Sequence, residues 1–170
     1  MKKAMKFLHT LGAIGLTGAI AVHLILLDSA PAPSSLAEYT AVRTSIAAVA
    51  TWMLLPSLAL VLLSGLMAIA AHPEFGSAGW VGAKVLLGLA IFEGTLVSIQ
   101  GPAVRNAEAA AAALAGDMEA AALPGLIHSE WGALWVVLVV CIANILLAVW
   151  RPRMSRRSRE ASPTESPAAP

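Results

Sequence analysis

Charged residues and cysteine are both scarce in this sequence. Asp, Glu, Lys and Arg make up only 12% of its 170 residues, whereas 58% of the residues are hydrophobic. A water-soluble globular domain usually carries about a quarter charged residues, so we expect lipid to surround most of this chain. The single cysteine, Cys141, excludes an intrachain disulfide and a thiol-rich metal site.

The motifs of common soluble enzymes are missing as well. The sequence has no Gly-rich phosphate loop, no nucleophile triad and no paired-cysteine motif. Its basic residues gather near the chain ends, which we interpret as a signal for membrane orientation and not for nucleic-acid binding. The expected partner is therefore membrane lipid, together with a membrane-protein partner or further copies of the chain.

Four apolar segments are each long enough to cross a membrane. A helix needs about 20 apolar residues to span about 30 Å of hydrocarbon, and its backbone groups must be hydrogen-bonded internally there. The sequence therefore predicts an all-α fold, a four-transmembrane-helix bundle within residues 1–150. Pro56 should kink the second helix. The predicted helices cover about residues 7–27, 46–71, 81–100 and 131–150.

The basic residues fix the predicted orientation. All of them except Arg43 and Arg105 fall on one side of the predicted spans, and positive flanks stay in the cytoplasm. The prediction is a multi-pass protein of the inner (plasma) membrane with cytoplasmic N- and C-termini. The small residues 30–32 also allow a second interpretation, in which the first segment is a cleaved secretory signal and three helices remain. The predicted outer loops hold Asp28, Glu38, Glu108, Asp117, Glu119 and Glu130.

Two further segments lie outside the predicted spans. Pro102 opens an Ala-rich stretch over residues 103–123, which predicts an extra outer helix on the membrane surface or over the mouth of the bundle. A solvated connector broken at Gly116 is the alternative. Residues 151–170 are basic at first and then rich in Ser and Pro, so we expect a disordered tail whose arginines contact lipid head groups.

Glu93 is the predicted intramembrane carboxylate. It lies about 18 Å into the third span at 1.5 Å per residue, where an acidic group should face the bundle and serve as a proton relay or ligand partner. A protonated, hydrogen-bonded packing role is the alternative. Lys84 falls on the opposite face of the same helix and reaches the inner interface.

The histidines are candidate haem ligands. His9 and His72 lie near the inner boundary, whereas His23 and His128 lie toward the outer one. Haem in a helical bundle is held by axial imidazoles from facing helices, so pairs at either level could bind one porphyrin. His9, at a helix start in an apolar run, is the best single candidate for the haem iron.

Short motifs resemble a group of small four-helix bacterial membrane proteins. The matching features are Leu8 with His9, Pro56 with Gly65, Trp80 with Lys84, and Glu130 before the last span. The group includes HemJ-type protoporphyrinogen oxidases, copper-resistance D-like proteins and uncharacterised integral membrane proteins. The resemblance to the oxidases implies a b-type haem on His9 and a functional lysine at Lys84. Glu93 stands near where that family has a second histidine.

Three functions are consistent with these features. The first is a membrane protein that binds haem or porphyrin within the bundle through His9, His23 or His72, with Glu93 and Lys84 as the catalytic candidates. The second is a membrane oxidoreductase of the protoporphyrinogen oxidase type. The third is a non-catalytic membrane subunit. An ion-handling protein in which Glu93 titrates is a further alternative.

Overall fold

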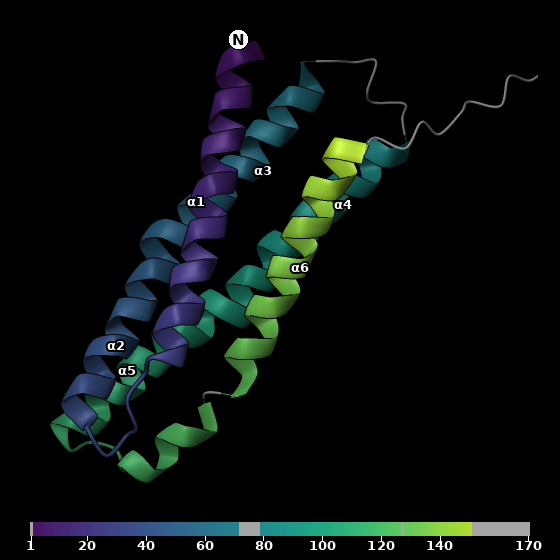
Figure 1. Cartoon of the computed structure of the whole chain (residues 1–170). Coiled ribbons are helices and arrows are strands. Elements are labelled where there is room, and N and C mark those ends of the chain that lie inside the picture. Colours follow the sequence, from purple (N-terminus) through teal and green to yellow (C-terminus); the bar gives the residue numbers. More distant parts are fainter. Residues whose placement is uncertain (1, 72–78, 127, 151–170) are drawn as a thin grey trace, which may run out of the picture.

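The computed structural model describes residues 2–71, 79–126 and 128–150. All regular structure in these residues is helical, which confirms the predicted all-α class. The helical elements run side by side along one long axis (Figure 1). They are α1 (Lys2–Asp28), α2 (Leu36–Val49), η1 (Ala50–Leu54), α3 (Leu55–Ala70), α4 (Gly79–Thr95), η3 (Leu96–Gln100), α5 (Gly101–Ala115), η4 (Ala120–Leu126) and α6 (His128–Trp150).

Two of the helical rods are longer than the sequence predicted. The elements α2, η1 and α3 form one continuous helix that begins at Leu36 and not near Ile46. In the same way α4 runs through η3 into α5, so the third helix does not end at Gln100. A rod of 35 residues is about 52 Å long, well beyond the hydrocarbon thickness of a bilayer. The rods therefore extend past the apolar segments at one end.

That end of the molecule is built from α2, α5 and η4, which lie together at the bottom of Figure 1. A small core of Tyr39, Ala110, Ala113 and Leu123 holds these three elements together. The predicted helix over residues 103–123 is only partly present: α5 ends at Ala115 and the separate segment η4 follows. The helix α5 continues the third rod and packs on α2. It ends at Gly116, whose positive φ of 88° closes the last turn. We call this region the outer end.

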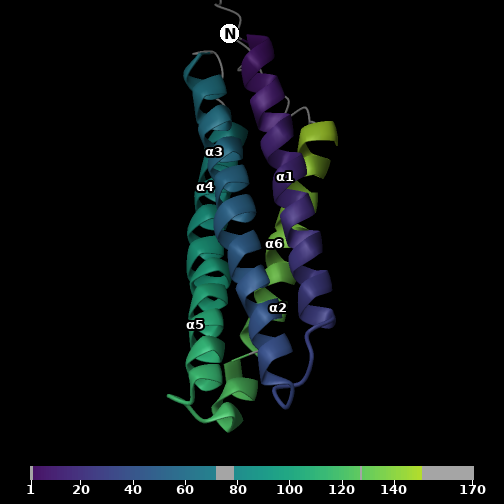
Figure 2. The same cartoon turned by 90° about the vertical axis from the view of Figure 1, so that its left-hand side faces the viewer.

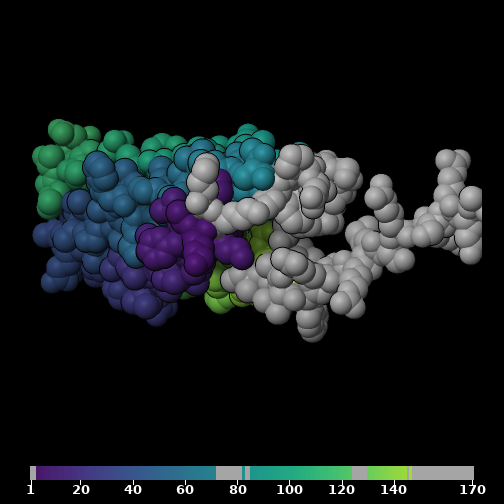
Figure 3. Space-filling view, turned by 90° about the horizontal axis from the view of Figure 1, so that it is seen from above, coloured from purple at the N-terminus to yellow at the C-terminus, as the bar shows by residue number. Residues whose placement is uncertain are grey.

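The opposite part of the molecule depends on close contact between α1 and α3. A Cβ atom added to Gly12 would lie 2.9 Å from the Ser57 carbonyl oxygen, so only glycine permits this approach. The helix contact resembles those of membrane bundles, in which small residues let two backbones come together. Figure 3 shows the first turns of α1 beside the blue residues of the second rod.

Three of the described helices are long and apolar enough to cross a membrane: Lys3–Asp28, Leu36–Ala70 and Val85–Ala115. The apolar part of α6 that is described in full, Glu130–Asn144, is shorter. The start of α1 and the end of α6 lie at the same end of the molecule, away from α5 (Figures 1 and 2). The predicted tail over residues 151–170 lies outside the described residues.

Candidate functional site

A buried ion pair connects two rods at the outer end. Nη1 of Arg43, on α2, donates a hydrogen bond of 2.7 Å to Oε2 of Glu130, in the first turn of α6. Both side chains are 0% exposed. Nδ2 of Asn106, on α5, donates a hydrogen bond to the other oxygen of the same carboxylate. Three helices far apart in the sequence therefore meet at one carboxylate.

Tyr39 completes this group on the arginine side. It lies one turn before Arg43 on the same face of α2, and Nε of Arg43 donates a 3.1 Å hydrogen bond to its hydroxyl oxygen. The guanidinium carbon lies 5.3 Å from the centroid of the tyrosine ring, within the range of a cation–π contact. We call Tyr39, Arg43, Asn106 and Glu130 the Arg43 cluster.

The position of Glu130 suits its charge. The first turn of a helix leaves backbone N–H groups without intrahelical acceptors, and its dipole favours a negative side chain. The pair with Arg43 makes the cluster close to neutral overall. Burial of either charge without the other would be far more costly than burial of the pair, so the two residues depend on one another.

His23 is the second buried polar group in this half of the molecule. It lies on α1, is 0% exposed, and neither ring nitrogen has a hydrogen-bond partner among the described residues. The positive charge of Arg43 acts on the ring. Nη2 of Arg43 is also buried, with no partner in the part of the chain that the structure describes. Buried polar atoms are nearly always satisfied in proteins, so we take these atoms and the Arg43 cluster together as the candidate site.

Two π-helical segments flank the same region. In each of them a proline follows two residues after the segment ends: Pro56 after η1 and Pro102 after η3. Proline cannot donate the regular backbone hydrogen bond, which fits an irregular segment in the turn before Pro56. Segments of this type occur often at functional sites, and η1 contacts both α1 and η3.

His9 has a different environment. Its side chain is exposed, and its Nδ1–H donates a hydrogen bond of 3.0 Å to the Val61 carbonyl oxygen, with Oγ of Ser64 at 3.1 Å. A carbonyl oxygen can only accept, so the proton is on Nδ1 and the lone pair of a neutral ring is on Nε2. Histidine ligands to metals are commonly oriented by such a bond.

The structure separates the other predicted site residues. Glu93 lies on the exposed face of α4 and makes no hydrogen bond or ion pair with any described residue. His9 and His23 lie far apart on one helix and at different levels. His72 lies outside the described residues, and the side chain of Lys84 does too, although its backbone belongs to α4. Within the described ranges no three His, Cys, Asp or Glu side chains gather as a metal site.

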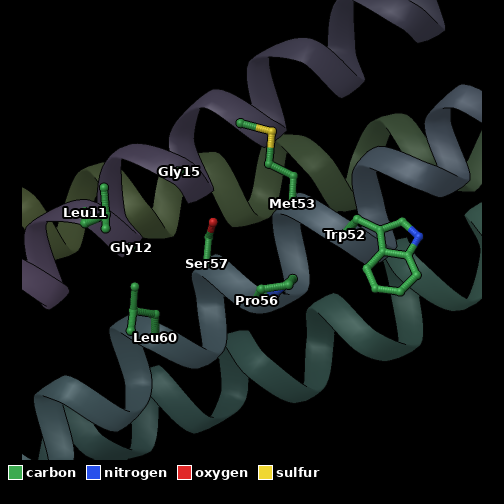
Figure 4. Close-up of a pocket in the computed structure, with 8 residues that line it drawn as sticks. All are labelled: Leu11, Gly12, Gly15, Trp52, Met53, Pro56, Ser57 and Leu60. Atoms are coloured by element: carbon green, nitrogen blue, oxygen red, sulfur yellow. The ribbon is translucent and has the colours of Figure 1, made fainter.

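A shallow groove lies between α1 and the second rod (Figure 4), and its size decides whether it could hold a porphyrin. Its volume is about 290 Å³, below the usual range for pockets that enclose even drug-sized ligands. Figure 4 shows the Ser57 hydroxyl pointing into the contact between Gly12 and Gly15. This groove is therefore too small to enclose a porphyrin.

The Arg43 cluster is the part of the site that the sequence does not predict. The apolar segments put Arg43 and Glu130 in outer loops, whereas both belong to helices and are buried. One signal was available: Tyr39 and Arg43 share a helix face with Ile46, a pattern typical of a helix that starts earlier than its apolar run.

Comparison with known proteins adds no assignment, since no family model, no curated protein and no solved structure matches the chain. The functional conclusion therefore depends on the geometry of the Arg43 cluster and His23.

Proposed function

We propose that this chain is an integral protein of the inner membrane that spans the bilayer four times and transfers protons through its buried polar groups. Both termini lie in the cytoplasm in this proposal. Three described helices of sufficient length and apolarity support it, together with the basic flanks of the chain. Large apolar side chains also cover the outside of these helices, as in Phe7, Ile14 and Leu86.

One observation carries the proton-transfer function: a fully buried Arg43–Glu130 pair lies near a fully buried His23 whose ring nitrogens have no partner among the described residues. His23 lies within the apolar span Lys3–Asp28, and ionisable groups inside membrane bundles usually mark ion pathways or proton relays. A neutral imidazole can accept a proton on one nitrogen and release a proton from the other, so its charge is unchanged after the transfer. The transfer leaves the opposite tautomer, and a flip of the ring restores the first one before the next proton.

The proposed transfer has three steps. A proton that arrives from the outer side adds to an oxygen of Glu130 and weakens its bond to Arg43. It then leaves that oxygen and adds to the free nitrogen of His23. The other nitrogen releases its own proton toward the inner half of the bundle, so one proton enters for each that leaves.

The direct test is proton flux into liposomes. The purified protein is reconstituted around a pH-sensitive dye, a potassium diffusion potential is imposed, and the initial rate of internal acidification is measured. His23→Phe should lower the rate on the order of a hundredfold, as expected when a positioned proton-transfer group is lost. Thr17→Val is the matched control, because Thr17 is exposed and its hydroxyl bonds only to its own helix.

Glu130→Gln tests the second group. The flux of this single variant does not decide the role of Glu130, because the substitution also leaves Arg43 without its counter-charge. The paired variant Arg43→Gln/Glu130→Gln keeps hydrogen-bonding groups in place without either charge. It should also abolish flux while eluting as a monodisperse species in detergent. Wild-type flux no greater than that of liposomes without protein would reject the function.

Haem binding is the second candidate, and the Nδ1–H bond of His9 to the Val61 carbonyl is the observation that favours it. His9 would hold the iron through Nε2, and the haem would supply redox chemistry. An oxidoreductase of the protoporphyrinogen oxidase type is the enzymatic form of this candidate. An absorption spectrum of the purified protein decides it: a Soret band lost in His9→Ala supports haem, and a colourless protein rejects both forms.

A further inference from the structure

Glu93 presents a problem that a single copy of the chain does not solve. Its carboxyl group lies on the exposed face of α4, without a hydrogen-bond partner among the described residues. The proposed membrane insertion puts it within the apolar span Val85–Ala115. A carboxyl group in hydrocarbon needs a donor or acceptor nearby, whether it is charged or protonated. Something in the membrane must therefore cover this face.

The surroundings of Glu93 are suited to another helix. Exposed side chains recur at spacings of three and four along α4 and into η3. Leu86 and Val97, on either side of Glu93, are 70% and 67% exposed. These spacings place them on one face of the helix. We define the α4 stripe as Leu86, Leu89, Ala90, Glu93, Gly94, Val97 and Ser98.

Small residues make close approach to this stripe feasible. Ala90, Gly94 and Ser98 follow one another at intervals of four, the pattern that lets two membrane helices pack backbone to backbone. A Cβ atom added to Gly94 would meet nothing within 4 Å, so no other part of the described chain covers this position. Gly12 differs from Gly94, because α3 already fills the space where a side chain of residue 12 would lie.

We propose that the α4 stripe is the interface with a second copy of this chain, with the two Glu93 side chains hydrogen-bonded to each other. A two-fold axis along the membrane normal brings the same residue of both copies to the same depth. A protonated carboxyl group offers one O–H donor and one C=O acceptor, so it is complementary to itself. A different protein would have to supply a polar group at this depth, whereas a second copy already has one.

This proposal depends on the membrane insertion proposed above but not on proton transfer. It is tested by disulfide cross-linking in native membranes, in a Cys141→Ala background. Gly94→Cys should give a covalent dimer on mild oxidation, because the two-fold axis passes close to this residue. Ile14→Cys is the control, since Ile14 is 66% exposed but lies on α1, away from the α4 stripe.

Two variants of Glu93 separate a specific interface from simple apolar aggregation. Glu93→Gln retains a donor and an acceptor, so the Gly94→Cys dimer should persist. Glu93→Leu removes both and should reduce the dimer at least about tenfold, the change that corresponds to one good hydrogen bond. Aggregation driven by apolar surface would instead give as much or more dimer with Glu93→Leu.

The outcomes are distinguishable. A protein extracted by carbonate fails at the insertion step. A carbonate-resistant protein that gives no dimer with Gly94→Cys, an undiminished dimer with Glu93→Leu, or a cross-linked product of another mass overturns the proposed interface.

Discussion

The two ends of this molecule are held together by different kinds of interaction. At the outer end, α2, α5 and α6 meet at buried charges, with Arg43 and Glu130 at the centre. In the opposite part of the molecule, α1 and α3 meet through glycines, with Gly12 against the backbone of α3. A buried charge needs a partner of opposite charge, so the ion pair determines which helices meet. Glycine packing determines how closely two helices approach.

The largest expected effect comes from breaking the charge pair at the outer end. Arg43→Leu leaves Glu130 buried without its counter-charge, so the free energy of unfolding in detergent micelles should fall by about 3–5 kcal/mol. Denaturation followed by circular dichroism measures it. The double variant Arg43→Leu/Glu130→Leu should recover most of this loss, because no lone charge remains. A single variant with wild-type stability would mean that the pair contributes nothing.

The glycine contact should give the next largest effect. In Gly12→Ala the added Cβ would lie 2.9 Å from a carbonyl oxygen and 3.0 Å from the backbone nitrogen of Val61. Backbone atoms cannot move aside as a side chain can, so we expect a loss of roughly 1–3 kcal/mol in the same unfolding assay.

Gly132→Ala is the matched control for this substitution. Nothing lies within 4 Å of its added Cβ, and alanine stabilises a helix relative to glycine by roughly 0.5–1 kcal/mol. Equal losses for both variants would show that α1 and α3 do not approach so closely.

A smaller effect is expected at the end of α5. Gly116 has a φ of 88°, a conformation that costs an L-residue about 1–2 kcal/mol. Gly116→Ala should lower stability by that amount and loosen the cap on the outer end, measured as faster proteolysis within residues 116–120. Gly116→Asn should lose less, because asparagine tolerates this conformation better. Identical behaviour of the two variants would contradict the assigned backbone conformation.

The smallest effect should come from Thr40 at the same end. Its hydroxyl donates both to the Leu36 carbonyl oxygen at 2.8 Å and to the Ala110 carbonyl oxygen at 3.1 Å. Thr40→Val removes the bond between α2 and α5, so stability should fall by roughly 0.5–1.5 kcal/mol. Thr44→Val is the comparison, since Thr44 bonds only within its own helix. A larger loss at Thr44 would argue against the α2–α5 contact.

The sequence predicted most of the helical content and very little of the site. Hydropathy located the apolar parts of all the rods, because burial in lipid requires long apolar runs whatever the neighbours are. The helix starts were less well predicted. Leu36 begins its helix ten positions before the predicted start near Ile46, since packing of Tyr39 and Arg43 against other helices extends the rod beyond its apolar part.

The candidate sites show the same division. The sequence singled out His9, His23 and Glu93 from residue type and depth, and these are properties of one helix. It did not pair Arg43 with Glu130, which are 87 positions apart, nor did it place Glu93 on the outside of α4. Those facts depend on how each helix is rotated about its axis and in which register it meets its neighbours.

The amino-acid sequence alone thus determined that this chain is helical and apolar, and which polar residues lie in its apolar segments. Only the tertiary structure decided that Arg43, Asn106 and Glu130 share one buried cluster, that His23 faces the interior and that Glu93 does not. The physical reason is that hydrophobicity acts on each segment separately. Which residues of different helices contact each other, and which face of a helix is buried, are set by side-chain packing between segments.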